Sequence, residues 1–252
     1  MRSLLILISL CLTVPAFART SGGSSGGGLV GGFDGSWSFE LYGGIVNATQ
    51  DALNQIHDTA NTREGGITTS ALTQAYEGAV GFTYRYSGSV YALSLRPSYF
   101  YERQDGHAAS GSFTYGVTGY TIFPMLRAYP LENDVMKFYM QVGVGYGQAK
   151  GMVNEGLLSG TDRHVEFGSG AFGSMVGLGA EFVLTGVQSV AVEVDYRYLD
   201  YVRNVVSSST GTGFGTGSLS QSGKGQEAEL DGNDLDIKMG GLMFNLGYIL
   251  HF

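Results

Sequence analysis

From residue 36 onward, apolar and polar residues alternate with a period of two, in segments that are separated by turn-forming residues. This alternation is typical of β-strands, because successive side chains of a strand point to opposite faces of a sheet. Eight segments follow the pattern and predict an all-β fold. They are residues 36–46, 75–86, 90–103, 111–129, 136–149, 169–184, 189–203 and 234–252.

The connections between these segments alternate in length. Four are long, at 47–74, 104–110, 150–168 and 204–233, and the three between them are short, at 87–89, 130–135 and 185–188. Short turns on one rim and long loops on the other are typical of transmembrane barrels. We therefore predict an eight-stranded antiparallel up-and-down transmembrane β-barrel with its long loops outside the cell. Within the first loop, Ala52, Leu53, Ile56 and Ala60 share one helical face and indicate a short helix.

The two faces of the predicted strands differ in polarity. In the segment 189–203, Val190, Val192 and Val194 fall on one face, whereas Glu193 and Asp195 fall on the other. A charge facing lipid near the bilayer midplane costs about 2 to 4 kcal/mol, so the charged face is expected to line the interior. Lipid offers no hydrogen-bond partner to an unpaired amide, so the strands are expected to close into a ring.

Aromatic residues on the predicted outward face gather toward the strand ends, as two interfacial girdles require. The turn-side girdle is predicted to contain Trp37, Phe39, Tyr84, Tyr86, Tyr91, Phe138, Phe182 and Tyr248. The loop-side girdle is predicted to contain Tyr99, Tyr101, Phe113, Tyr115, Tyr146, Phe172, Tyr196 and Tyr198.

Ten charged residues fall at predicted inward positions. An eight-stranded barrel is just wide enough to be filled by side chains, so we expect these charges to pair and close the lumen. The alternative is a narrow conduit that opens when a pair exchanges partners. Inward glycines at 143, 145, 177 and 179 either leave a hollow or admit Tyr42 and Tyr139. The predicted lumen network is Glu40, Glu77, Arg85, Arg96, Arg127, Lys137, Glu181, Glu193, Asp195 and Arg197.

The first 18 residues have the pattern of an export signal. Arg2 supplies the positive start, an apolar core follows, and Ala16 and Ala18 form a small-residue cleavage site. We expect the signal over 1–18, a flexible Gly/Ser-rich leader over 19–35 and the barrel over 36–252. The only cysteine, Cys11, lies in the signal, so no disulfide is expected in the exported protein.

Acidic residues outnumber basic ones, 22 to 14, for a net charge of −8. This balance argues against a nucleic-acid partner, because nucleic-acid binding needs basic patches. Carboxylates gather over 227–236, but their order does not match a calcium loop, so no metal site is predicted. Asp105, His107 and Ser110 share one loop without a supporting catalytic motif. We expect no catalytic residues and no cofactor.

The last strand carries an unbroken alternation of apolar side chains up to residue 252. It resembles the C-terminal signature by which bacterial outer-membrane barrels are recognised for assembly. With the signal and the loop asymmetry, residues 36–252 resemble the small eight-stranded barrels of the OmpA, OmpX and OmpW kind. The predicted assembly signal is Phe244, Leu246, Tyr248, Leu250 and Phe252.

The resemblance implies a monomer in the outer membrane of a Gram-negative bacterium. Its implied partners are outer-membrane lipid, lipopolysaccharide and, through the last strand, the barrel-assembly machinery. Our leading hypothesis is a non-enzymatic scaffold whose surface-exposed loops serve a structural or adhesive role. The alternative is a small porin-like channel for ions or small hydrophobic solutes, and a third hypothesis is a lipid A-modifying enzyme.

Overall fold

A computed structural model describes residues 35–64, 68–108, 111–157, 163–210, 223–230 and 233–252. The expected signal, 1–18, and all but the last residue of the expected leader, 19–35, lie outside the described residues. The described part contains the predicted barrel.

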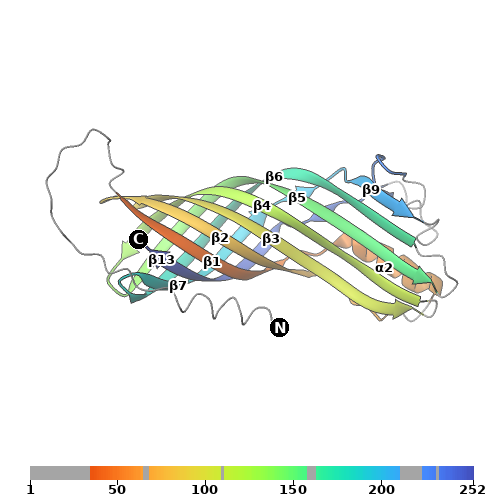
Figure 1. The fold of residues 1–252 in the computed structure, drawn as a ribbon, viewed down its shortest axis with the longest axis horizontal. Helices are drawn as coiled ribbons and strands as arrows, with labels where there is room; N and C mark the ends of the chain where they lie inside the picture. Colours follow the sequence, from red (N-terminus) through yellow and green to blue (C-terminus); the bar gives the residue numbers. More distant parts are fainter. Residues whose placement is uncertain (1–34, 65–67, 109–110, 158–162, 211–222, 231–232) are drawn as a thin grey trace. The chain divides into compact units, whose positions relative to one another are not determined.

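Eight long antiparallel strands form a closed ring (Figure 1). Each strand pairs with its neighbour in the chain, and the last strand also pairs with the first, from Ser38 opposite His251 to Asn47 opposite Leu242. The predicted fold class is confirmed. The ring strands are β1 (Gly35–Asn47), β2 (Gln74–Tyr86), β3 (Tyr91–Ala108), β4 (Gly111–Glu132), β5 (Met136–Leu157), β6 (Arg163–Thr185), β7 (Gln188–Tyr198) and β13 (Gly241–His251).

Strands β5 and β6 extend far into the stretch 150–168, which the sequence predicted to be a loop. Their extended parts pair from Lys150 opposite Gly168 to Glu155 opposite Arg163. On the inner face of this hairpin, Val153 and Phe167 are buried. The hairpin therefore continues as a sheet beyond the predicted strand ends, held by an apolar inner face.

The pattern of polarity reverses along the long strands. In the turn-side part of β4, Ile122 and Leu126 point outward and are exposed. In its loop-side part, Phe113 and Tyr115 point inward and are at most 1% exposed. The prediction that Phe113 and Tyr115 belong to the outward girdle is wrong, because these strand parts face water outside and an apolar core inside.

The seventh strand is shorter than predicted, and the last one begins later. Strand β7 ends at Tyr198, after which Leu199 turns into the buried core. Strand β13 begins at Gly241, whose φ of 149° is a conformation that side-chain-bearing residues rarely adopt. Between them lie β8 (Asp200–Tyr201), β9 (Val205–Thr210), β10 (Glu229–Leu230), β11 (Asn233–Asp234) and β12 (Ile237–Lys238).

These short strands extend the loop end of the barrel. Strand β9 pairs with β6, from Val205 opposite Gly168 to Thr210 opposite His164, and so takes the place that β7 leaves. Strand β12 pairs with β8, and β10 pairs with β11. The stretch around β9 is poor in apolar residues, yet Val206 is buried there and anchors the strand.

The helix expected in the first loop is present as α2 (Asp51–Glu64), and it lies at the loop end of the barrel (Figure 1). Leu53 and Ile56 are buried on its inner face. Asn54 donates from Nδ2 to the carbonyl of Leu72 (3.0 Å) and accepts at Oδ1 from the Leu72 amide (2.8 Å). No helix among the described residues has the length and apolar character to cross a bilayer.

Candidate functional site: the barrel interior

At the centre of the interior, Arg127 and Glu40 form a two-pronged ion pair. Arg127 Nη1 lies 2.6 Å from Glu40 Oε1, and Nη2 lies 2.9 Å from Oε2. Both side chains are at most 1% exposed. Arg127 Nε donates to Gln141 Oε1 at 3.0 Å, so both guanidinium edges are used. Such paired geometry offsets part of the cost of burying the two charges.

Glu193 joins this pair to a second arginine. Arg96 Nη1 lies 2.7 Å from Glu193 Oε2, and Arg96 Nη2 donates to Oε1 at 2.8 Å. Arg127 Nη2 approaches the same Oε1 to 3.3 Å, and the Tyr139 hydroxyl donates to it at 2.5 Å. Two arginines and two glutamates therefore form one connected cluster.

Asp195 extends the cluster through neutral amides. Gln141 Nε2 donates to Asp195 Oδ1 at 2.6 Å, and Asn245 Nδ2 donates to Oδ2 at 2.8 Å. Arg96 is more distant, with Nη1 3.7 Å from Oδ2. The central cluster thus contains Glu40, Arg96, Arg127, Glu193 and Asp195, held together by Gln141, Asn245 and Tyr139.

The other predicted inward charges lie in separate pairs. Toward the loop end, Arg197 Nη1 donates to Glu77 Oε2 at 2.8 Å, and its Nε donates to the Met239 carbonyl at 2.9 Å. On the turn-side rim, Lys137 Nζ lies 2.8 Å from Glu181 Oε1, which also lies 2.9 Å from His251 Nε2.

Arg85 completes the turn-side rim. Its Nη1 and Nη2 donate to the two carboxylate oxygens of Glu132, at 2.9 and 2.7 Å. These hydrogen bonds lower the pKa of the Glu132 carboxyl. Sequence reasoning missed Glu132 because it lies beyond the predicted strand 111–129. It gave no partner to His251, although this residue lies at an inward position of the predicted last strand.

Aromatic rings pack on the buried guanidinium groups. Arg96 lies over the Tyr42 ring, 4.1 Å from its centroid, and Arg127 lies 4.8 Å from the centroid of Tyr139. A desolvated cation over a ring gains about 2 kcal/mol. Glycine makes this possible, because a Cβ at Gly179 would collide with the Tyr139 ring and one at Gly247 with the Tyr42 ring.

The other inward glycines also leave space that a neighbouring side chain fills. A Cβ at Gly143 would meet Met125, at Gly145 Phe123, and at Gly177 the Asp195 carboxylate. Of the two alternatives that the sequence left open, the glycines admit large neighbours. Between the central cluster and the Glu77–Arg197 pair, the cavity found has a volume of about 10 Å³. That is room for about one water molecule.

Toward the loop end the interior becomes apolar. Phe100, Phe167, Leu199 and Tyr201 are all fully buried there, and Leu53 of α2 belongs to the same core. Gln50, just before the helix, donates to the Lys238 carbonyl at 2.6 Å and accepts from the Lys238 amide at 3.1 Å. Helix α2 is thus a plug, tied to β12 and seated on the apolar core.

One carboxyl group lies buried beside this plug. Glu102 is 4% exposed, and its Oε1 accepts a hydrogen bond from the Gln74 amide at 2.8 Å. Burial raises the pKa of Glu102 to about 7, against weaker opposing effects of hydrogen bonds from Gln74 and Gln50. No sequence signal marks this group, because an isolated glutamate near a strand end resembles a solvated one.

Only some of the loop residues considered for catalysis or metal binding lie close to one another. Asp105 Oδ1 accepts from Arg103 and Thr114 rather than from His107, and Ser110 lies outside the described residues. Glu227, Glu229 and Asp234 place carboxylate oxygens within 4.8 Å of one another, all exposed. Exposed carboxylates alone do not define a cation site.

The barrel exterior is an apolar belt. Between its aromatic ends, none of the charged side chains of the described ring strands points outward. Exposed outward residues include Val144, Leu178 and Leu246. On the turn side the belt ends at residues such as Trp37 and Tyr91. On the loop side it ends at Tyr76, Tyr99, Tyr101, Tyr120, Tyr146, Phe172, Tyr196 and Tyr198.

We take the membrane-spanning segments to be the strand parts between these ends. In β3 the segment runs from Tyr91 to Tyr101, so Glu102 lies beyond it. Tyr76 and Tyr120, which are not among the predicted girdle residues, belong to the loop side. Tyr84 points outward but is covered by Trp37 and Tyr86, whose ring centroids lie 4.8 and 4.9 Å away.

No protein-family model and no curated protein matches this chain. Solved structures do match. Ail, the attachment invasion locus protein of Yersinia pestis, is 10% identical, with a TM-score of 0.42 over 87% of this chain and 99% of Ail. Neisserial surface protein A is 11% identical (TM-score 0.43, 86% and 97% covered). A major outer membrane protein from Thermus thermophilus is 12% identical (TM-score 0.48, 86% and 99% covered).

The chain's own geometry carries the assignment. Its eight ring strands close on one another, its exterior is apolar between two aromatic bands, and the charges between these bands face inward. A bilayer requires each of these properties of a strand protein that crosses it. This chain is an eight-stranded antiparallel transmembrane β-barrel.

Proposed function

We propose that this protein is a non-enzymatic scaffold that anchors an extracellular sheet in the outer membrane, with a structural or adhesive role. The observation that carries the proposal is the filled interior. The central charged cluster, the apolar core and helix α2 occupy successive levels of the described lumen. A barrel whose interior is filled with packed side chains is suited to anchor an extracellular structure rather than to conduct ions or solutes.

What it would hold is the sheet formed by the loop-side parts of β3, β4, β5, β6 and β9. In β5, the residues from Gly147 to Leu157 lie beyond the girdle residue Tyr146. At about 3.4 Å per residue and a tilt near 40°, they would rise roughly 28 Å above the membrane boundary. Outward positions there are polar, such as Lys150 and Glu166, which suits a surface in contact with water or with another cell.

The channel hypothesis requires that the same residues leave an open path through the barrel. An aqueous path would have to break both guanidinium pairs of the central cluster, and a buried charge left unpaired costs about 3 to 5 kcal/mol. It would also have to displace α2 from the apolar core. A channel is therefore the alternative function, and the conductance measurement described below distinguishes it from the scaffold.

We further propose that the predicted assembly signal, from Phe244 to Phe252, is recognised by the barrel-assembly machinery and that the barrel is a monomer. Strand β13 supports the proposal because it forms the seam with β1. The amide of Phe252 donates to the Trp37 carbonyl at 2.9 Å, so Phe252 adds a backbone hydrogen bond to that seam.

Two measurements test the scaffold. Refolded protein in planar bilayers is expected to give no steady conductance, and a reproducible single-channel step would favour the channel instead. For orientation, a cysteine is introduced at exposed Ser112 in the loop-side sheet, with Ser87 in a short turn as the matched control. A membrane-impermeant maleimide should label S112C on intact cells and S87C only after permeabilisation. The reverse result would overturn surface display of the sheet.

A further inference from the structure

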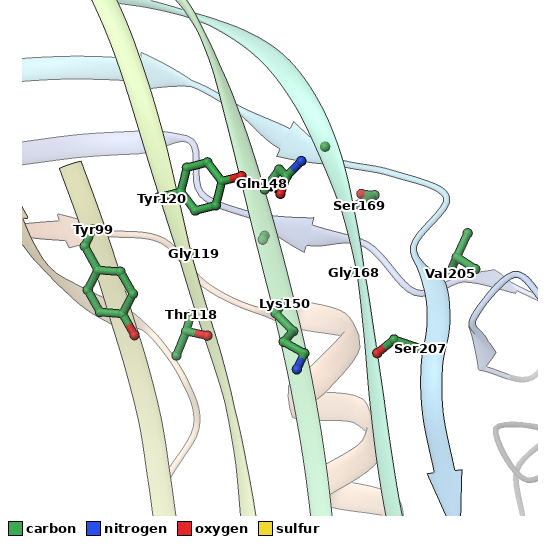
Figure 2. A pocket seen from close by; sticks show the side chains of 12 residues that line it. Tyr99, Thr118, Gly119, Tyr120, Gln148, Lys150, Gly168, Ser169, Val205 and Ser207 are labelled. Carbon is green, nitrogen blue, oxygen red and sulfur yellow. Dashed lines mark hydrogen bonds between the residues drawn. The ribbon is translucent and has the colours of Figure 1, made fainter. Parts of the chain in front are cut away.

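The outer wall of the barrel is hollowed at the level of the loop-side girdle. A groove of about 540 Å³ crosses β3, β4, β5, β6 and β9. Figure 2 shows Tyr99, Tyr120 and Lys150 along it on three successive strands. Its wall is polar. The Tyr120 hydroxyl donates to Gln148 Oε1 at 2.5 Å, and Ser207 donates to the Glu166 carbonyl at 3.2 Å.

A second groove, of about 520 Å³, lies on the same wall within the apolar belt. Its surface is almost wholly apolar, and its lining includes the exposed Val144 and Phe172, which is 83% exposed. Ser174 is a small, outward-pointing residue of its lining. The groove lies between β4, β5, β6 and the end of β7.

The two grooves adjoin each other. Tyr120 and Gln148 line the polar groove, and the next outward residues of the same strands, Ile122 and Tyr146, line the apolar one. Tyr120 is opposite Gln148 in the sheet, and Ile122 is opposite Tyr146. Gln148 Nε2 donates to the Tyr146 hydroxyl at 3.3 Å. That hydroxyl lies where the groove with polar side chains adjoins the almost wholly apolar one.

We propose that this two-part groove binds one lipid of the outer leaflet that carries acyl chains and a phosphorylated sugar headgroup. An acyl chain would lie in the apolar groove, against Val144 and Phe172. The headgroup would lie in the polar groove, where Tyr99, Gln148 and Lys150 offer donors. The inference rests on the proposed orientation, with the loop end outside the cell.

Lys150 gives the polar groove its affinity for phosphate. Its Nζ lies 2.6 Å from Glu166 Oε2, yet the side chain stays 53% exposed. An ammonium group has three donors, and the pair with Glu166 uses one. A phosphate at the headgroup level can therefore accept from the other two, and each lysine near an anionic lipid surface contributes about 1 kcal/mol.

The position of the two grooves relative to the bilayer identifies a lipid as their occupant. The apolar groove faces the hydrocarbon of the bilayer, where lipid is the solvent, and the polar groove begins where headgroups begin. A second copy of the barrel would have to match a wall that carries hydroxyl groups and one lysine directly above an almost wholly apolar one. A lipid has that order of polarity along its own length.

The test measures the lipid that remains with the folded barrel. The full chain is expressed in a Gram-negative host, extracted from outer membranes in a mild detergent, and its lipid A and phospholipid are quantified per barrel by mass spectrometry. Ser174→Trp fills the apolar groove from an outward position, and Val194→Trp on the outward face of β7 is its matched control. Lys150→Gln removes the cation, and Arg103→Gln, which removes an exposed, paired cation outside the groove, is its control.

We expect S174W to lower retained lipid A by about tenfold, a change of one decade in affinity. K150Q should lower it by about fivefold, the effect of one cation near the lipid surface. Both controls should retain the wild-type amount, and heat-modifiable migration in gels shows that each variant is folded. Equal lipid A in all folded variants would overturn the proposal, as would retention of phospholipid alone or a dimer that S174W abolishes. The maleimide experiment separates failure of the orientation from failure of the lipid site.

Discussion

The central cluster makes a quantitative prediction about Arg127. Substitution by methionine keeps much of the side-chain volume but removes the cation from between Glu40 and Glu193. Glu40 would keep Thr83, whose hydroxyl lies 2.8 Å from Oε1, and lose both guanidinium contacts. A buried charge left without its partner costs about 3 to 5 kcal/mol, so R127M should lower the free energy of unfolding by that amount.

A double variant separates the lost charge pair from lost packing. With Glu40→Met added to R127M, the orphaned carboxylate is gone, and replacement of a buried pair by apolar side chains is often close to neutral. The double variant should therefore be at least about 1 kcal/mol more stable than R127M. Arg103→Met is the surface control, since Arg103 pairs with Asp105 in solvent and should change stability by under about 0.5 kcal/mol.

Urea unfolding from lipid vesicles is a suitable assay, because the chain has one tryptophan. Trp37 lies on the turn-side belt, 54% exposed, so its fluorescence reports whether the strand is in lipid. A loss below about 1 kcal/mol for R127M would refute a tightly coupled cluster. A double variant less stable than R127M would show that packing of the arginine, rather than its charge, is what matters.

Four further predictions concern the plug and the carboxyl group beside it, the glycines and the seam. Because burial raises the pKa of Glu102 from 4.5 to about 7, its contribution to stability is fully present below pH 4.5 and is lost as the pH rises through 7. Urea unfolding should therefore show a decline of up to about 3 kcal/mol toward alkaline pH that Glu102→Gln abolishes, and an unchanged profile in E102Q would contradict it. Leu53→Ala should cost about 2 to 5 kcal/mol at the loop end, seen as faster amide exchange in α2 while the ring amides stay protected; uniform loosening would contradict a separate plug. Gly179→Val should collide with the Tyr139 ring and lower the folded fraction in gel-shift assays more than Gly78→Val, whose Cβ meets open space. Deletion of Phe252 should reduce the amount of barrel assembled in outer membranes, and an undiminished amount would exclude it from the assembly signal.

The ring itself could be predicted from the sequence, because inside a bilayer the rule for each position is simple. Val190, Val192 and Val194 must face lipid, and Glu193 and Asp195 must not. This rule holds only between the girdles. Phe113 and Tyr115 were assigned to the lipid face because their aromatic side chains continue the alternation, although the strand had already left the membrane and the rule had reversed.

It was harder to predict which charged residues pair inside the barrel than to predict which residues face inward. Alternation placed Arg96 and Glu193 on the inner face, but their pairing depends on the ring register that joins distant strands. Gln141 and Asn245 are neutral residues whose role appears only once Asp195 lies between them. Glu102 became a buried acid because segments far apart in the sequence cover it, which no local pattern encodes.

The seam between β1 and β13 has a consequence for how the protein folds. Ser38 and His251 are roughly 200 residues apart in the chain, so the closing contact has a very high contact order and a large loop-closure cost. Before it forms, every partly assembled sheet exposes two edges that could pair with another chain. Closure is therefore expected to be the slow step, and aggregation its main competitor. A cell would have to keep the chain unpaired in transit until the final strand reaches the membrane.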